Sequence, residues 1–110
     1  LFAPKSVAVI GASEKFDKLG FHVMKSLTKG GYGGVIIPVN PGADTIMGIK
    51  VFKSMLDYEG IIDLAIIVVP AKFVPQVIDE CAKKGVGGIV LITAGFREID
   101  DPDGAVLQKN

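Results

Sequence analysis

The sequence predicts an α/β fold in which helices flank a doubly wound, mainly parallel sheet. Four apolar runs rich in Val and Ile are spaced along the chain, at residues 7–10, 35–39, 64–69 and 89–92. Nearly continuous apolar runs of this length are typical of strands that are buried on both faces, as in parallel sheets. Helical patterns lie between the runs, and an alternation of strand and helix predicts right-handed crossovers.

Two segments between these runs have helical periodicity, and a third helix is expected to begin near Asp103. The first helix is expected near residues 19–29, where Leu19, Val23, Met24 and Leu27 share one side. The second carries an apolar stripe that Gly85 is placed to end. Its solvent face offers two i, i+4 pairs, Asp79 with Lys83 and Glu80 with Lys84. The stripe consists of Val74, Val77, Ile78, Cys81 and Ala82.

An internal repeat supports two helix-to-strand connections of one geometry. The segment GYGGVIIPV at residues 31–39 matches GVGGIVLIT at residues 85–93, at an offset of 54 residues. The region 41–60 is less regular. There we expect a short edge strand at residues 49–52 and then a helical turn capped by Ser54, with Asp57 three residues later.

Composition limits the classes of protein that the chain can represent. Its 110 residues are 49% hydrophobic and predict a single domain over residues 1–110. Twelve basic and twelve acidic residues give no electrostatic reason to expect nucleic acid or a membrane surface as a partner. The apolar runs are too short to cross a bilayer, and the single cysteine permits no internal disulfide. We expect a cytoplasmic protein, and the start at Leu1 suggests the N-terminal part of a longer multidomain chain.

Ligands of open α/β sheets bind beyond the carboxyl ends of the strands, so the residues after each apolar run are the candidate site. These residues are small, turn-forming or hydroxylic, which favours binding over catalysis. The first corner, Gly11-Ala12-Ser13 followed by Gly20, is typical of a phosphate loop at a helix N-terminus, to which Lys15 and Lys18 add positive charge. The alternative is a tight turn that serves packing alone. The other three corners are Asn40-Pro41-Gly42, Pro70-Ala71 and Thr93-Ala94-Gly95.

Two features of the strand ends disfavour NAD as the ligand. The dinucleotide fingerprint G-x-G-x-x-G has glycine where Ser13 stands, and here Gly20 comes nine positions after Gly11. The fingerprint also has an acidic residue at the end of the second strand, where this chain has Asn40. A P-loop NTPase is excluded because the G-x-x-x-x-G-K-[ST] motif is absent from the sequence.

The remaining reactive residues predict no catalytic group and no metal site. His22 has no nucleophile, acid partner or second ligand nearby in the sequence, so we expect an exposed or helix-packing histidine. Cys81 lies on the apolar stripe and is expected in the core. The acidic residues around Pro102 are typical of a helix start, and Arg97 and Glu98 could either contact a ligand or flank the last loop.

Four blocks, PKSVAVIGAS, GGVIIPVNP, DLAIIVVPA and GIVLITAGF, appear in this order along essentially the whole chain. In this respect the chain resembles the N-terminal CoA-binding domain of NDP-forming acyl-CoA synthetases, the family of ADP-forming acetate–CoA ligases related to the alpha subunit of succinyl-CoA synthetase. The resemblance implies a Rossmann-like domain that holds the ADP portion of coenzyme A. It also implies that ATP or GTP binds to other domains or subunits of a synthetase, and that this part alone binds CoA without turnover.

The resemblance further implies roles for the residues at the strand ends. Gly11, Ala12 and Ser13, with the residues up to Gly20, would surround the phosphates. Val39, Asn40 and Pro41, together with Val69 and Pro70, would flank the adenosine. Thr93, Ala94 and Gly95 would border the path toward the thiol. Relatives often carry a lysine after the Asn-Pro corner, where this chain has Gly42-Ala43-Asp44.

The residues leave two alternatives to the synthetase domain. One is a non-catalytic CoA-binding regulatory module, for example of a protein acetyltransferase, and the other is an NAD-sensing Rossmann domain. Without the lysine after Pro41, the cations that could neutralise a CoA phosphate are Lys15, Lys18 and Lys50.

Overall fold

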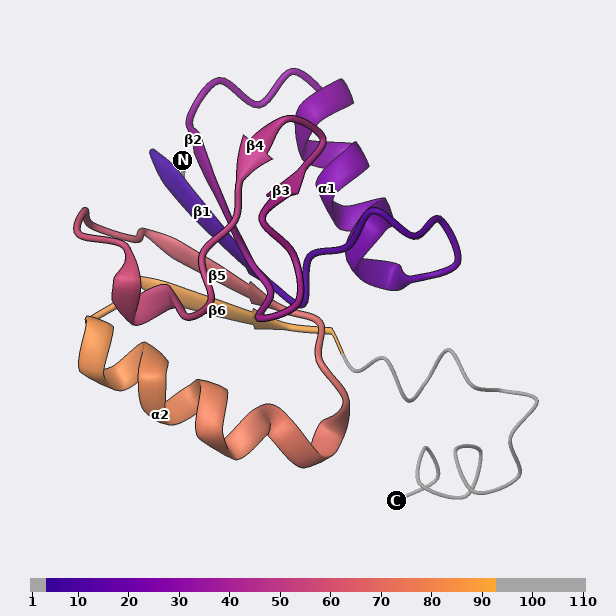
Figure 1. Cartoon of the computed structure of the whole chain (residues 1–110). Coiled ribbons are helices and arrows are strands. Elements are labelled where there is room, and N and C mark those ends of the chain that lie inside the picture. Colours follow the sequence, from indigo (N-terminus) through magenta and orange to yellow (C-terminus); the bar gives the residue numbers. More distant parts are fainter. Residues whose placement is uncertain (1–3, 93–110) are drawn as a thin grey trace.

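A computed structural model of the chain describes residues 4–92, and these form a parallel sheet between two helices (Figure 1). The strands are β1 (Ser6–Ile10), β2 (Val35–Val39), β5 (Leu64–Ile67) and β6 (Gly88–Leu91). They lie in the order β2-β1-β5-β6, and all three pairings are parallel. The chain therefore winds outward from β1 in both directions, and the predicted doubly wound α/β fold is confirmed.

The two helices cover opposite faces of this sheet. Helix α1 (Leu19–Lys29) follows β1 and buries Met24 in a cluster with Val7 and Val9. Helix α2 (Val74–Lys84) buries Val77 and Cys81 in a second cluster. Since successive side chains of a strand point to opposite faces, the apolar part of β1, residues 7–10, supplies both clusters. Neither helix, within residues 4–92, is long and apolar enough to cross a membrane.

Helix α2 has one of the two predicted ion pairs on its solvent face. Lys83 Nζ lies 3.2 Å from Asp79 Oδ2. The Glu80–Lys84 pair was predicted wrongly, because both side chains bind residues that flank the short 3₁₀ helix η1 (Met55–Asp57). Glu80 accepts a hydrogen bond from Ser54 Oγ, and Lys84 donates to the carbonyl oxygen of Tyr58. Tertiary partners thus replace the local pair.

The helix-to-strand connections share the geometry that the internal repeat predicts. Gly31 and Gly85, which are equivalent in the repeat, both have left-handed backbone, with φ of 84° and 76°. In each connection the amide of the next residue, Tyr32 or Val86, donates to a carbonyl in the last turn of the preceding helix. The third expected helix, which would begin near Asp103, lies outside the described residues.

The region between β2 and η1 departs from the prediction of a simple edge strand. Strand β3 (Thr45–Ile46) and strand β4 (Ile49–Lys50) form a separate antiparallel hairpin. Its turn places both Met47 and Gly48 at positive φ, 53° and 77°. Phe52 alone extends the main sheet, through a parallel bridge to Val39. The capped turn is confirmed, since Ser54 Oγ accepts from the amide of Leu56 at 3.1 Å.

Strand β6 is less buried than its apolar sequence predicts. Ile89, Val90 and Leu91 are 43%, 42% and 47% exposed, whereas the β1 strand is fully buried. The register pairs Ile89 and Leu91 with Ala65 and Ile67, which belong to the α2-side cluster. Edge position alone does not explain the difference, because β2 is the opposite edge of the sheet and still buries Ile37 and Val39.

Candidate ligand-binding site

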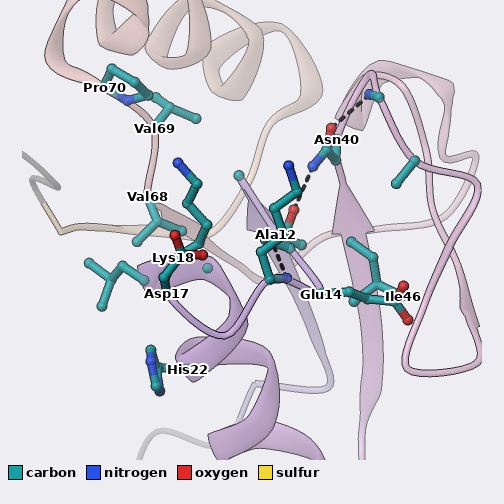
Figure 2. Close-up of a pocket in the computed structure, with 17 residues that line it drawn as sticks. Ala12, Glu14, Asp17, Lys18, His22, Asn40, Ile46, Val68, Val69 and Pro70 are labelled. Atoms are coloured by element: carbon teal, nitrogen blue, oxygen red, sulfur yellow. Dashed lines mark hydrogen bonds between the residues drawn. The ribbon is translucent and has the colours of Figure 1, made fainter.

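A pocket of about 850 Å³ opens at the carboxyl ends of β1, β2 and β5. This is the edge at which ligands bind in open α/β sheets. Its walls come from the β1–α1 loop, the first turn of α1, the segment after β2 and the segment after β5 (Figure 2). The lining residues are Gly11, Ala12, Ser13, Glu14, Lys15, Asp17, Lys18, Leu19, Gly20, His22, Asn40, Gly42, Ala43, Ile46, Val68, Val69 and Pro70.

Two glycines allow the β1–α1 loop to lie tightly against the sheet. Gly11 has φ of 99°, and a Cβ there would lie 2.7 Å from the carbonyl oxygen of Val68. Gly20 is buried in the first turn of α1, and a Cβ there would collide with the carbonyl oxygen of Gly11. These are the positions of a turn glycine and a helix-packing glycine, as in dinucleotide-binding loops, although the segment between them is longer.

Ser13 and the start of α1 offer hydrogen-bond donors to the pocket. Ser13 Oγ accepts from the amide of Lys15 at 2.9 Å, which leaves the hydroxyl hydrogen able to donate to a ligand. Lys18 is the N-cap residue of α1, and its side chain makes no capping bond in the described structure. The amide of Phe21 donates to the carbonyl oxygen of Lys18 at 3.1 Å, whereas the amides of Leu19 and Gly20 have no backbone partner in the described structure and can donate to an anion.

Asn40 joins the loops after β1 and β2. Its Nδ2 donates to the carbonyl oxygen of Ala12, and its Oδ1 accepts from the amide of Gly42, both at 2.7 Å. Figure 2 shows the side chain between these two partners. Its amide group thus holds the shape of the pocket, a role that the sequence pattern did not indicate.

The structure brings most of the proposed site residues together. Val39 and Pro41 do not line the pocket. Val39 is buried, with its carbonyl oxygen accepting from the amide of Gly11 at 2.9 Å, and Pro41 is exposed. Thr93, Ala94 and Gly95 lie outside the described residues, as do Arg97 and Glu98. The pocket-lining members are Gly11, Ala12, Ser13, Lys15, Lys18, Gly20, Asn40, Val69 and Pro70.

Of the three candidate cations, the structure places Lys15 and Lys18 at the pocket. Lys50 is directed elsewhere, with its Nζ 5.2 Å from the ring centroid of Phe52. The sequence reasoning overlooked Lys53, whose Nζ donates to the carbonyl oxygen of Pro41 at 3.1 Å and lies 3.7 Å from Asp44 Oδ1. Lys53 thus lies beside the Asn40-Pro41-Gly42 corner, which itself contains no lysine. Lys53 and Pro41 are twelve positions apart, so no local sequence motif predicts this contact.

Several lining residues were not predicted as site residues, and two of them are acidic. Glu14 and Asp17 place negative charge beside the two pocket lysines. His22 is exposed, as expected, but it also lines the pocket, where its Nε2 donates to the carbonyl oxygen of Phe16 at 2.8 Å. Its position in the first turn of α1 was the available signal. The other additions are Leu19, Gly42, Ala43, Ile46 and Val68.

The described residues offer neither a cluster of metal ligands nor an exposed thiol. Among residues 4–92, no group of three or more His, Cys, Asp or Glu side chains is arranged to hold a metal ion. Cys81 lies in the α2-side core, 1% exposed. Burial raises the pKa of its thiol, and the neighbouring Glu80 carboxylate raises it further, so this cysteine is a poor nucleophile.

Comparison with known proteins identifies the family. The sequence model described as "CoA binding domain" matches residues 2–95. The chain belongs to the CoA-binding domain family. It is 56% identical over 96 residues to the ADP-forming acetate–CoA ligase of Methanocaldococcus jannaschii. This match covers 87% of the chain and 13% of that ligase. It is 50% identical over 113 residues to the alpha subunit of ADP-forming acetate–CoA ligase I from Pyrococcus furiosus, covering 99% of this chain and 24% of that subunit.

A solved structure extends the similarity to three dimensions. The dinucleotide-forming acetyl-coenzyme A synthetase 1 of Ca. Korarchaeum cryptofilum, solved with phosphate and ADP, superposes on this domain with a TM-score of 0.82 at 38% identity. The match covers 96% of this chain and 23% of that one. This CoA-binding domain therefore spans less than a quarter of the length of these relatives and has their fold.

Proposed function

We propose that this domain binds the ADP portion of coenzyme A within an acyl-CoA synthetase of the NDP-forming class. Such an enzyme would join a carboxylic acid to CoA while cleaving a nucleoside triphosphate to the diphosphate and phosphate. The observation that carries the proposal is the position of the pocket, at the carboxyl ends of three strands, in a chain that matches the CoA-binding domain family over residues 2–95. The relatives named above are ADP-forming ligases, which supports the class of reaction.

The donors and charges of the pocket suit a nucleotide diphosphate. The two unpaired amides at the start of α1 and the Ser13 hydroxyl can donate to phosphate oxygens, and Lys15 and Lys18 can neutralise their charge. Ile46, Val68 and Val69 provide an apolar wall of the kind that an adenine ring packs against. The volume of the pocket, about 850 Å³, lies within the usual range for small-molecule sites.

Within such a synthetase, this pocket would bind CoA and other domains would carry out the reaction. None of its described side chains forms a nucleophile–base pair, so we assign it binding and orientation only. The ATP or GTP site and the acyl-transfer chemistry would belong to other domains or subunits. Thr93, Ala94 and Gly95 would line the route by which the CoA thiol reaches them.

Titration calorimetry of the 110-residue chain with CoA, dephospho-CoA and NAD tests the proposal. We expect saturable binding of CoA, weaker binding of dephospho-CoA, and the weakest binding of NAD. An absence of heat with CoA, or tighter binding of NAD, would overturn the proposal. In the full-length protein, an acetyltransferase domain in place of the synthetase domains would favour a regulatory module.

Lysine variants identify the phosphate contacts. Lys15→Ala and Lys18→Ala should each weaken CoA binding about tenfold, because each removes a charge-assisted hydrogen bond worth about 1.4 kcal/mol. Lys29→Ala is the matched control, since Lys29 lies at the opposite end of α1. Equal affinities for all three variants and the wild type would remove the two lysines from the site.

A further inference from the structure

Glu14 is one of two carboxylates that line the pocket beside Lys15 and Lys18, and it connects two walls of that pocket. It follows Ser13 in the β1–α1 loop, and its Oε2 accepts a hydrogen bond from the amide of Met47 at 2.9 Å. The two residues are 33 positions apart. Figure 2 shows the Glu14 side chain extending from the loop toward Ile46, the residue before Met47. The bond therefore ties the loop to the β3–β4 hairpin.

The residue that Glu14 holds lies in a backbone conformation that favours glycine. Met47 has φ of 53°, in a two-residue turn with Gly48. Its sulfur lies 3.7 Å from Thr28 Oγ1 on α1, whose hydroxyl hydrogen donates to the carbonyl oxygen of Met24 at 2.9 Å, so this is a contact between side chains. Ile46, beside it, is completely buried and lines the pocket. Holding the Met47 amide thus fixes the position of an apolar wall of the pocket.

The negative charge of Glu14 is not needed for this bond, because the neutral amide oxygen of glutamine could accept from the same N–H. The charge does affect the ligand. Together with Asp17, it offsets the two lysines of the pocket, so a highly charged ligand meets a weaker attraction than the lysines alone would give. Shape and charge selectivity therefore depend on the same side chain.

We propose that Glu14 is a positioning residue that fixes the hairpin wall through Oε2 and limits the affinity for polyanionic ligands through its charge. The inference deepens the proposed CoA site and rests on it for the identity of the ligand. The hydrogen bond to the hairpin and the negative charge are separable properties of this side chain, and a pair of variants distinguishes their effects.

The experiment compares Glu14→Gln and Glu14→Ala with the wild type and with Glu59→Gln, a change of an exposed glutamate in the loop before β5. Amide hydrogen exchange of Met47, followed by NMR, measures the tie. Calorimetry with CoA and with inorganic pyrophosphate measures the effect of charge. We expect Glu14→Gln to keep Met47 protected and to bind both ligands about threefold more tightly, because one nearby like charge is removed.

Glu14→Ala should lose the protection of Met47 and bind CoA more weakly than Glu14→Gln, although both lack the charge. A purely structural role would leave the affinity of Glu14→Gln at the wild-type value, and that result overturns the claim on charge. Unchanged Met47 exchange in Glu14→Ala overturns the claim on the hairpin. If the wild type binds pyrophosphate but not CoA, the proposed function fails, and the response of Glu14→Gln to pyrophosphate still decides the inference.

Discussion

At the scale of single residues, Gly20 decides how closely α1 approaches β1. A Cβ on this residue would collide with the carbonyl oxygen of Gly11, which belongs to the backbone and cannot rotate away. We expect Gly20→Ala to lower the free energy of unfolding by about 3 kcal/mol, as is typical of overpacking in a rigid setting. Chemical denaturation with urea measures this loss.

Gly33→Ala is the control for this prediction. A Cβ on Gly33 meets no atom within 4 Å in the described structure. The control variant should therefore unfold within about 0.5 kcal/mol of the wild type. Equal stabilities of the two variants would show that the α1 N-terminus can move outward without cost.

Asn40 is the residue whose assigned role changed most between sequence and structure. Asn40→Asp keeps an acceptor for the Gly42 amide but places a carboxylate oxygen against the carbonyl oxygen of Ala12. We expect a loss of about 2 kcal/mol in unfolding free energy at neutral pH and weaker CoA binding, because a half-buried hydrogen bond becomes a repulsion. The loss should shrink on acidification, when a protonated carboxyl can donate to Ala12. Urea denaturation at neutral and at acidic pH measures the loss of unfolding free energy and its decrease on protonation. A loss that does not change with pH would contradict this explanation.

At the scale of elements, the sequence predicts well where one periodicity runs between clear stop signals. Helix α1 at Leu19–Lys29 and strand β2 at Val35–Val39 have the predicted bounds. The β3–β4 hairpin was missed because its strands have two residues each, and its turn uses Met47 where asparagine or glycine is the usual signal. The exposure of β6 was missed for another reason. An apolar run does not reveal how much of a strand other elements cover.

Helix α2 contains a probe of its own stability. Because Cys81 is buried between α2 and the sheet and its thiol pKa is raised, we expect alkylation only from molecules in which α2 has opened. The rate with iodoacetamide should therefore rise with urea in parallel with the unfolding equilibrium. Fast alkylation in the absence of urea, at a rate near that of the unfolded chain, would show that α2 opens locally.

At the scale of the whole molecule, the pocket is a property of the topology. Gly11, Asn40 and Val69 are far apart in the sequence, and they meet because β1, β2 and β5 are parallel neighbours that end at the same edge. That rule predicts the backbone corners of the site from sequence. It does not predict the side chains that cross between corners, such as Glu14 on Met47 or Lys53 on Pro41, since their partners are set by the path of irregular segments.

A ligand that bridges three strand ends should stabilise the entire domain. At a concentration 100 times its Kd, a CoA analogue without a thiol, desulfo-CoA, is expected to add about 2.7 kcal/mol to the free energy of unfolding. For a domain of this size, the melting temperature should then rise by about 10 °C or more.

The same concentration of desulfo-CoA should slow the alkylation of Cys81 about 100-fold, since only the opened molecule reacts and the ligand binds only the folded one. Cys81 lies in the α2-side core and is not among the residues that line the pocket, so direct shielding does not account for such protection. The effect should fall in Lys18→Ala in proportion to its loss of affinity. A rise in melting temperature without slower alkylation would mean that α2 opens while the ligand stays bound, and that the domain does not unfold as one unit.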